Sequence, residues 1–330
     1  MANRFIGIGE ESTYRTPVAA TEYIDVVREA LGPSDRSFIA VETAGRRELP
    51  DKVPGPYRAG GSFDFIVNAD NITKLLKWAL GNVTTTDDGL ATPVAYRHDF
   101  TPADEIKSFT IEAAPGVKDG ATLKSRQFAG CAVRSLSLEA VARELLVSTV
   151  EVIAAKDALI NSTTPTFSTV RPFVFFEGQL TLEGSAVANV EAFRVRIENS
   201  IPDDAHVLGD MFLPGIRLEG IRVTGDMDVA FLNWDLWKRF WGSATATEPQ
   251  TNVENVGLKL TMTGLSTGST GAGFENYKLE VDIPAAYLDT SEAGFDRRTR
   301  TVQSLGFEGV YDASAGHLIK VSVINKKSAP

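Results

Sequence analysis

Residues 264–268 (GLSTG) have the GxSxG spacing in which a serine can act as a nucleophile. That chemistry needs the serine on a sharp turn between a strand and a helix, with a histidine base later in the fold. A strand-like segment, LKLTM, precedes Ser266, but the loop-like STGAG follows it, and the only later histidine is His317, in a predicted turn. The pattern therefore favours a flexible hairpin tip over a catalytic serine.

Other motifs for catalysis or metal binding are incomplete. Residues 268–273 (GSTGAG) lack the following lysine of a phosphate-binding loop. Cys131 is the only cysteine, which excludes thiolate zinc sites such as CxxC. Asp203, Asp204 and His206 could ligate a cation, but a metal site needs three or four convergent ligands, and a solvated loop is the favoured interpretation. The sequence therefore predicts neither an enzyme nor a cofactor.

The charge balance limits the kind of partner. The chain of 330 residues has a formal net charge of −10. This argues against a protein that binds duplex DNA tightly, because such proteins need a basic face. We find no apolar run of about 18 residues and no apolar stretch near the N-terminus, so we expect no membrane partner and a soluble protein made in a cytosol.

The elements that position these residues are arranged as a repeat. Residues 61–81 read GSFDFIVNADNITKLLKWALG, and residues 225–242 read GDMDVAFLNWDLWKRFWG. Each is an alternating strand followed by a short amphipathic helix. An offset of 164 aligns the two strands, and an offset of 161 aligns Leu75 with Leu236 and Gly81 with Gly242. The half-length match predicts one domain used twice.

Strand-like segments fill most of the remainder, and punctuated segments separate them. Residues 1–20 show no helix or strand period and predict an N-terminal arm. Residues 43–57 and 199–214 predict two long, corresponding loops. We expect a mainly β fold with two tandem β-sandwich or barrel domains, each with one flanking short α-helix. The predicted boundaries are an arm at 1–20, domains at 21–160 and 171–330, and a linker at 161–170.

Tryptophans line one side of the second predicted helix. Trp234, Trp237 and Trp241 have helical spacing and could form an aromatic platform for a sugar or a base. Packing in the core is the favoured interpretation, and it predicts that Trp237→Ala destabilises the fold by about 3–5 kcal/mol.

Several segments together resemble a known family. The opening GIGEESTYRTPV, the unit GSFDFIVNADNITKLLKWALG, and the pairs AGCAVRSLSL with LLVSTVEVIA and FVFFEGQLTLEG with FRVRIENSI are similar to major tail tube proteins of tailed bacteriophages and related tailed viruses. The resemblance spans nearly the whole chain. It implies a β-sandwich-like domain that packs into rings, and rings that stack into the hollow virion tail through which viral DNA leaves. In that family the sheets line the lumen, the helix lies to the side, and loops or arms bridge rings.

Applied to this chain, the resemblance implies specific contacts and partners. The bridging segments are residues 7–18, 46–57 and 199–214. The expected contact residues between rings and subunits are Gly7, Glu10, Tyr14, Pro17, Arg46, Arg47, Pro54, Tyr57, Asp203, Asp204 and Pro214. Because the family's common form has one domain per chain and six chains per ring, three chains could complete a pseudo-sixfold ring. The alternative is a hexameric ring with the second domain outside the tube.

The remaining implied partners are a tape measure protein, a tail terminator and baseplate or tip proteins, with DNA passing through the lumen without specific binding. An acidic or neutral lumen would repel phosphate and favour such passage. The competing function is a tandem β-sandwich carbohydrate-binding or adhesin module that uses the tryptophans. Without residues 1–18, stacking is expected to weaken while each domain still folds.

Overall fold

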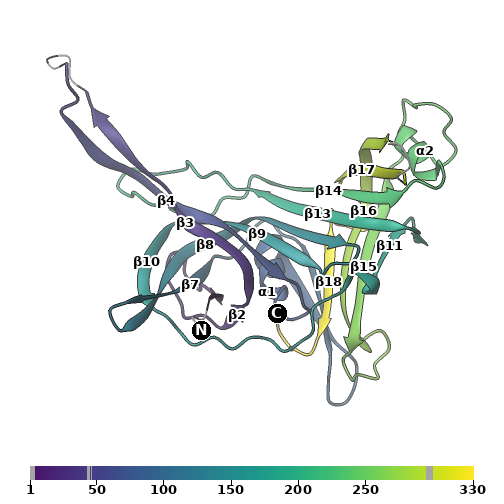
Figure 1. The fold of residues 1–330 in the computed structure, drawn as a ribbon, viewed down its shortest axis with the longest axis horizontal. Coiled ribbons are helices and arrows are strands. Elements are labelled where there is room, and N and C mark those ends of the chain that lie inside the picture. The colour runs from purple at the N-terminus through teal and green to yellow at the C-terminus, as the bar shows by residue number, and fades with distance from the viewer. Residues whose placement is uncertain (1–3, 43–44, 46, 295–299) are drawn as a thin grey trace.

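The computed structural model describes residues 4–42, 45, 47–294 and 300–330. Antiparallel strands dominate the described chain, with two short α-helices (Figure 1). The prediction of a mainly β fold is therefore confirmed. The helices occur where the sequence places an apolar stripe, and the strands occur largely where apolar and polar residues alternate.

The first half contains ten strands and one α-helix: β1 (Phe5–Glu10), β2 (Glu22–Ile24), β3 (Val26–Val41), β4 (Asp51–Ile66), α1 (Thr73–Leu80), β5 (Gly81–Asp87), β6 (Tyr96–Pro102), β7 (Phe109–Asp119), β8 (Thr122–Val141), β9 (Val147–Ala154) and β10 (Lys156–Asn161). The second half contains a 3-10 turn (Phe175–Glu177), then β11 (Gly178–Leu182), β12 (Ser185–Ala186), β13 (Val190–Ser200), β14 (Gly220–Ala230), α2 (Asp235–Trp241), β15 (Val256–Ser266), β16 (Asn276–Gly294), β17 (Val302–Gly309) and β18 (Lys320–Asn325).

One uninterrupted antiparallel sheet runs through both halves. Its eight strands lie in the order β3-β4-β9-β8-β13-β14-β17-β16, so that β3 and β16 form its two ends (Figure 1). A second layer lies beneath each half, β2-β1-β7-β8-β10 in the first and β12-β11-β15-β16-β18 in the second. The hairpin β5–β6 pairs with β18 and ties the two halves together a second time.

The strand pairings of the first half recur in the second. Seven pairings link β1, β2, β3, β4, β7, β8, β9 and β10, and seven link β11 to β18 in the same pattern, with β1 corresponding to β11, β4 to β14 and β8 to β16. Only β5 and β6 lack a counterpart among the described strands.

Register irregularities recur at equivalent places, with one extra residue in one strand of each pair. The β3–β4 pair shifts between Val26 and Arg28, and the β13–β14 pair between Val190 and Ala192, an offset of 164 (190 − 26). The β8–β9 pair shifts between Val133 and Ser135, and the β16–β17 pair between Leu288 and Thr290, an offset of 155 (288 − 133). The β7–β8 and β15–β16 pairs also shift at corresponding residues, Phe109/Ile111 and Val256/Leu258.

The repeated glycines have a common steric cause. A Cβ on Gly61 would lie 2.1 Å from the carbonyl oxygen of Ala30, and a Cβ on Gly225 would lie 2.2 Å from that of Arg194. Ala30 and Arg194 are themselves 164 residues apart. Each glycine therefore lets two strands approach at the same point of the repeat.

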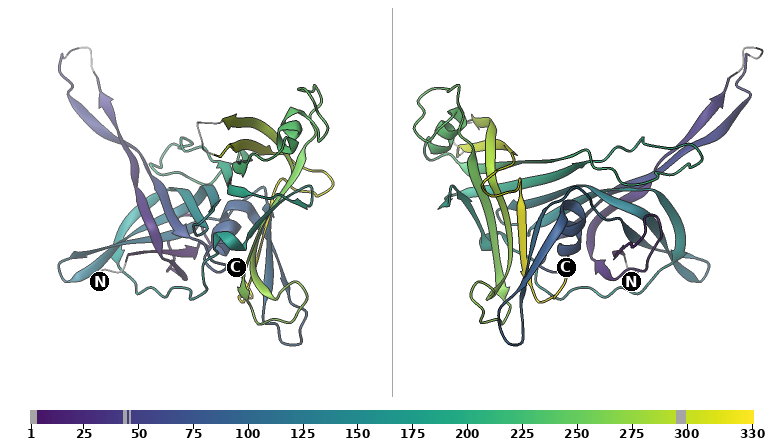
Figure 2. Two further views of the ribbon diagram at one scale, coloured as in Figure 1. Left: turned by 45° about the vertical axis from the view of Figure 1, so that its right-hand side comes forward. Right: turned by 180° about the vertical axis from the view of Figure 1, so that it is seen from behind.

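The two helices are buried to very different degrees. Helix α1 lies between the layers (Figure 2), with Leu75, Leu76 and Trp78 buried, and the Trp78 ring stacks on Phe109 with centroids 4.2 Å apart. Helix α2 lies at the far end of the second half and has no buried residue. The prediction that the tryptophans of α2 pack into the core is therefore wrong: Trp234 is 56% exposed, and Trp237 is half-buried.

Three other local predictions need correction. Residues 1–20 contain β1, whose Phe5, Ile6 and Ile8 are buried in the core, so the expectation of no regular structure there is wrong. The predicted loop 43–57 overlaps β4, which begins at Asp51, because β3 and β4 form one long hairpin. The predicted linker begins within β10. The domain boundaries stay a prediction, since the eight-stranded sheet continues from one half into the other.

Candidate functional site

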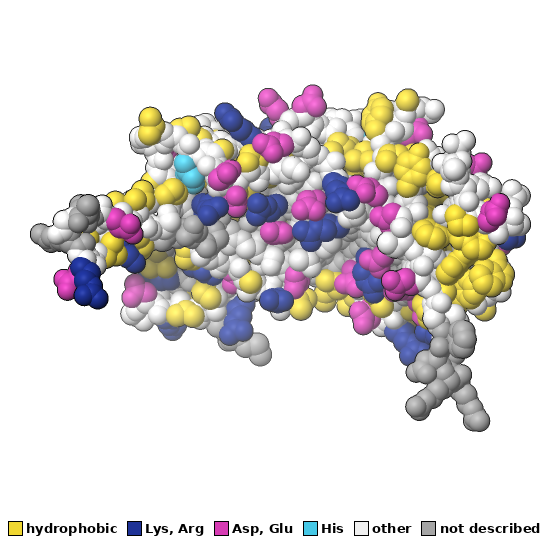
Figure 3. Space-filling view, turned by 90° about the horizontal axis from the view of Figure 1, so that it is seen from above, with side chains coloured by type: hydrophobic (Ala, Val, Ile, Leu, Met, Phe, Trp, Pro, Cys, Tyr) yellow, Lys and Arg dark blue, Asp and Glu magenta, His cyan; other side chains and the backbone are white. Residues whose placement is uncertain are grey.

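A charged face covers the eight-stranded sheet on the side away from the core. Alternation along β13 sends Phe193, Val195 and Ile197 into the core and Arg194 and Arg196 to the opposite face. The view from above shows side chains of both signs interspersed across this face (Figure 3).

Carboxylates surround each arginine of this face. Arg194 lies 2.7 Å from Glu139 on β8, 2.6 Å from Asp226 and 3.1 Å from Asp228 on β14. Arg196 lies 3.3 Å from Glu151 on β9. The pairs Arg194–Glu139 and Arg196–Glu151 cross the junction between β8 and β13, so charges that cover the face also link the two halves.

The ionisation of these groups reflects that pairing. Hydrogen bonding to Glu139, together with Asp226 and Asp228, raises the pKa of Arg194. The hydrogen bond from Arg222 lowers the pKa of Glu308, and the same contact raises the pKa of Arg222. Arg194 and Arg222 are therefore cationic, and the neighbouring carboxylates neutralise their charge locally. The ion pairs between strands of this face join four arginines (Arg134, Arg194, Arg196, Arg222) to six carboxylates (Glu139, Glu151, Glu198, Asp226, Asp228, Glu308).

Predicted contact residues meet where the loop 201–219 crosses the first half. The Tyr14 hydroxyl donates to the Leu213 carbonyl oxygen at 3.2 Å, and burial raises the pKa of Tyr14 to about 12. The Tyr57 backbone N–H donates to the Met211 oxygen at 3.0 Å. Asp203 lies 3.1 Å from the Arg58 guanidinium. The structure thus brings Tyr14, Tyr57 and Asp203 onto one contact inside the chain.

The other predicted contact residues are dispersed. Gly7 and Glu10 lie on β1, where Glu10 forms ion pairs with Lys77 at 2.5 Å and Lys107 at 3.0 Å. Burial opposes ionisation of Glu10, but hydrogen bonds from both lysines lower its pKa overall. The remaining described residues of the set are exposed on loops or on β4: Pro17, Arg47, Pro54, Asp204 and Pro214. Arg46 lies outside the described residues.

The hairpin β3–β4 projects far from the body of the molecule (Figure 1). Its outer part exposes large apolar side chains: Phe38 (53%), Ile39 (58%), Val41 (37%), Leu49 (48%) and Val53 (42%). Exposed apolar side chains gathered on one element are typical of a surface that another chain covers.

The places suggested for catalysis hold no reactive group. Ser266 ends β15, its hydroxyl donates to the Glu275 oxygen at 3.1 Å, and the chain turns back into β16 rather than entering a helix. The hairpin interpretation is therefore confirmed, but Thr267 and Ser269 are buried and hydrogen-bonded, so the segment is packed rather than a free tip. In the described part of the chain, no group of three His, Cys, Asp or Glu side chains converges as metal ligands.

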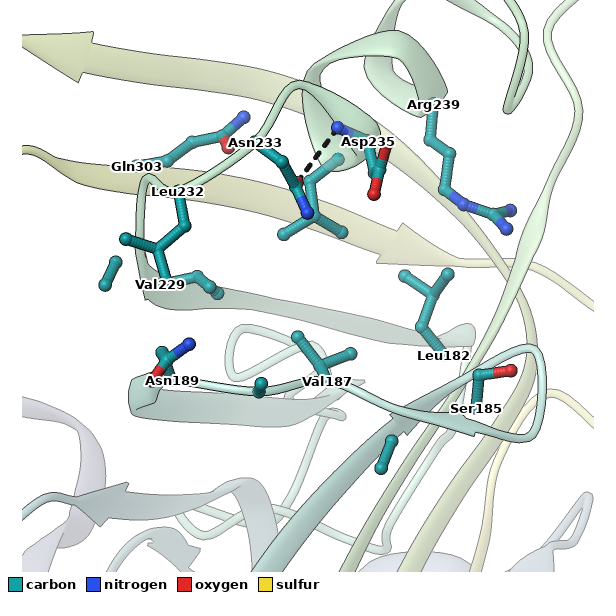
Figure 4. Close-up of a pocket in the computed structure, with 14 residues that line it drawn as sticks. Leu182, Ser185, Val187, Asn189, Val229, Leu232, Asn233, Asp235, Arg239 and Gln303 are labelled. Carbon is teal, nitrogen blue, oxygen red and sulfur yellow. Dashed lines mark hydrogen bonds between the residues drawn. The ribbon is translucent and has the colours of Figure 1, made fainter.

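A surface pocket of about 330 Å³ lies between β12, the end of β14 and α2 (Figure 4). Its lining includes the apolar side chains of Val187, Val229, Leu232 and Leu236. Among the residues drawn, the Asn233 side chain accepts one hydrogen bond, from the Asp235 backbone N–H. This lining shows no paired acid and base. Among the described helices, none combines the length and the apolar character that a membrane span needs.

Two polar residues with many contacts escaped the sequence analysis. Glu11 is 4% exposed and accepts hydrogen bonds from Ser108, Thr110, Arg15 and Gly130. Asn199 is buried, and its amide donates to Ala79 and Val133 oxygens in the first half. Their partners lie up to 120 residues away in the chain, so no local pattern identifies them.

An antiparallel β chain with a projecting apolar hairpin, a salt-bridged sheet face and no converged catalytic group in its described part fits the class of structural assembly proteins. The family model described as phage tail tube protein matches residues 1–309. The chain belongs to this family, which confirms the resemblance seen in the sequence, and it is a structural component of the virion tail rather than an enzyme. The comparison with curated proteins gave no match.

Proposed function

We propose that the chain carries two tail tube repeats side by side. The support is the recurrence of seven strand pairings, three register shifts and one strand-packing glycine in each half. The first repeat comprises β1 to β10 and the second comprises β11 to β18. Residues 5–10 then belong to the first repeat and not to a separate arm, because β1 corresponds to β11.

Three such chains form one ring of the tube. The observation that carries this proposal is the unbroken eight-stranded sheet, in which both halves present the same charged face. Three copies supply 24 strands (3 × 8). Barrels of about 16–18 strands already enclose an aqueous channel, so a barrel of this size leaves room for a wide one. A second repeat placed outside a six-chain tube would not continue the wall of the first.

The charged face lines the lumen. Four arginines of this face are each paired with at least one carboxylate, and among these paired groups the strand carboxylates outnumber the arginines by two (6 − 4). Such a surface offers phosphate few free cations, and its mild excess of negative charge favours passage of DNA without tight binding.

Contacts between rings involve the projecting hairpin and the exposed loops. Arg47 and Pro54 lie on that hairpin or next to it, and Pro17, Asp204 and Pro214 lie on exposed loops. At the ends of the tube, the same surfaces meet a tail terminator and baseplate or tip proteins, and the lumen encloses a tape measure protein during assembly.

Electron microscopy of the purified chain tests this function. We expect tubes of uniform width whose end-on averages show six similar lobes per ring, and a mass per ring of three chains. A ring of six chains would contradict the stoichiometry but not the tube. A chain that stays monomeric under all assembly conditions and binds glycans saturably would contradict the tube and favour a carbohydrate-binding module.

A further inference from the structure

We propose that the ring closes through pairing of the β16 edge of one copy with the β3 edge of the next, in the register of the junction that already joins β8 to β13. This inference rests on the proposed function, because it concerns a second copy of the same chain. The two edges pair antiparallel, as β8 and β13 do.

The internal junction is the template. Residues 135–141 of β8 pair antiparallel with residues 192–198 of β13, and Glu139 lies directly opposite Arg194. Their side chains meet across the junction at 2.7 Å. This junction joins the last strand of one four-stranded unit to the first strand of the next unit.

The counterparts of these two strands have open edges. Strand β16 corresponds to β8, and over residues 286–294 its described pairing is with β17 alone. Strand β3 corresponds to β13, and its described pairing is with β4 alone. The two edges lie at opposite ends of the eight-stranded sheet (Figure 1). An unpaired edge is a template for another strand, and here the complementary edge belongs to the same chain.

The offsets between the halves fix the register. Adding 155 to Glu139 gives Gly294, and subtracting 164 from Arg194 gives Ala30. Gly294 of one copy therefore faces Ala30 of the next, and Glu292 faces Gly32. Ala30 and Gly294 are both exposed in the single chain, and a Cβ added to Gly294 would meet nothing within 4 Å.

The projecting hairpin fits the same junction. Residues 201–219 cover the first half, where Leu213 packs in one cluster with Ala132 and Ile153. Subtracting 164 places this loop on residues 37–55, the outer part of the β3–β4 hairpin, and places Leu213 on Leu49. Adding 155 places Ala132 on Tyr287.

Leu49 is 48% exposed and Tyr287 is 39% exposed in the single chain. Ring closure brings these two exposed apolar side chains to the same contact. The exposed apolar surface of the hairpin thus acquires a defined partner, which is the β16 end of the neighbouring copy.

Cysteine cross-linking of assembled tubes tests the register. In the double variant Ala30→Cys/Gly294→Cys, we expect oxidation or a short bismaleimide to link neighbouring copies, giving dimers and trimers on denaturing gels and a ladder that ends at three. The native Cys131 is fully buried and does not compete. Glu139→Cys/Arg194→Cys is the positive control, because the same reagents should link its cysteines within one chain.

The negative control is Ala30→Cys/Ala293→Cys. A shift of one residue sends the second side chain to the other face of the sheet, so this pair should link at least tenfold more slowly. Tubes of the first variant that do not cross-link, or equal linking of the shifted pair, would overturn the proposed junction and leave the tube itself standing. Failure of the wild-type chain to form tubes would instead overturn the proposed function.

Discussion

Replacing Glu11 by alanine tests whether the N-terminal segment is part of the folded core. The carboxylate is 4% exposed and accepts hydrogen bonds from the Ser108 hydroxyl at 2.7 Å, the Thr110 hydroxyl at 2.8 Å and the Gly130 backbone N–H at 2.9 Å. The Arg15 backbone N–H donates a fourth at 3.1 Å. The Glu11 carboxylate therefore holds the segment after β1 against β7 and β8.

The expected cost follows from what the alanine leaves behind. Hydrogen bonds to a charged acceptor contribute about 1.5–3 kcal/mol each, but such contributions do not add when the donors share one acceptor. The two hydroxyls can rotate to other acceptors, but the buried Gly130 N–H cannot. Leaving this donor without a partner costs about 1–3 kcal/mol of folding stability. Removal of the charge also removes its desolvation cost. We expect Glu11→Ala to lower the free energy of unfolding by about 2–4 kcal/mol, because the Gly130 N–H is left without a partner and the bonds to the two hydroxyls and the Arg15 N–H are lost.

Urea unfolding of the unassembled chain, followed by tryptophan fluorescence and by circular dichroism, measures this loss. Glu10→Gln, at the neighbouring residue that ends β1, is the control. Glu10 makes ion pairs that are partly exposed to solvent, so this change should cost about 1 kcal/mol or less. A loss below 1 kcal/mol for Glu11→Ala, or equal losses for both variants, would refute the reasoning.

Two further predictions use the same assay. Gly225→Ala should destabilise the fold by about 3 kcal/mol, because its Cβ would lie 2.2 Å from the Arg194 carbonyl oxygen and 2.4 Å from the Phe307 ring. A neutral effect would show that the strands can separate there at no cost. Trp78→Ala should cost about 3–5 kcal/mol, because this ring is fully buried and stacked on Phe109, whereas the half-buried Trp237 should cost less than about 2 kcal/mol on the same change. Equal losses for the two tryptophans would contradict the burial difference between α1 and α2.

The repeat that we propose is visible in the sequence because two physical constraints leave local traces. Alternation along a half-buried strand and the apolar stripe of a helix are visible in any window of about ten residues. The glycines at 61 and 225 mark the same close approach of two strands. These traces gave the mainly β fold, helix α1 and most strands of the central sheet.

Strand β1 escaped detection because its glycines mimic a loop. Gly7 and Gly9 look like punctuation in the sequence, but a Cβ on Gly7 would lie 2.7 Å from the Ala20 Cβ, and one on Gly9 would lie 2.5 Å from the Ala19 oxygen. They mark close packing inside a strand rather than a turn. Pro54 also led to the prediction of a loop, although it lies within the outer part of β4.

The charged face could be predicted only in part. The alternation in FRVRIENS places Arg194 and Arg196 on one side of β13, but their partners Glu139 and Glu151 come from strands 55 and 45 residues earlier. Which carboxylate faces which arginine depends on strand order, and local periodicity holds no information on strand order. Three of the predicted contact residues, Tyr14, Tyr57 and Asp203, likewise meet at one internal contact only through the path of loop 201–219.

The differences between the halves follow from the place of each half in the chain. The junction between β8 and β13 forms within one molecule, and the hairpin β5–β6, which pairs with β18, reinforces it. Each association between separate molecules costs translational and rotational freedom, estimated at about 4–15 kcal/mol. In the ring that we propose, three chains incur this cost at three junctions, because the other three junctions form when each chain folds. Selection can then strengthen the internal junction with long-range contacts such as that of Asn199, while the edges of β3 and β16 stay open until a second copy arrives.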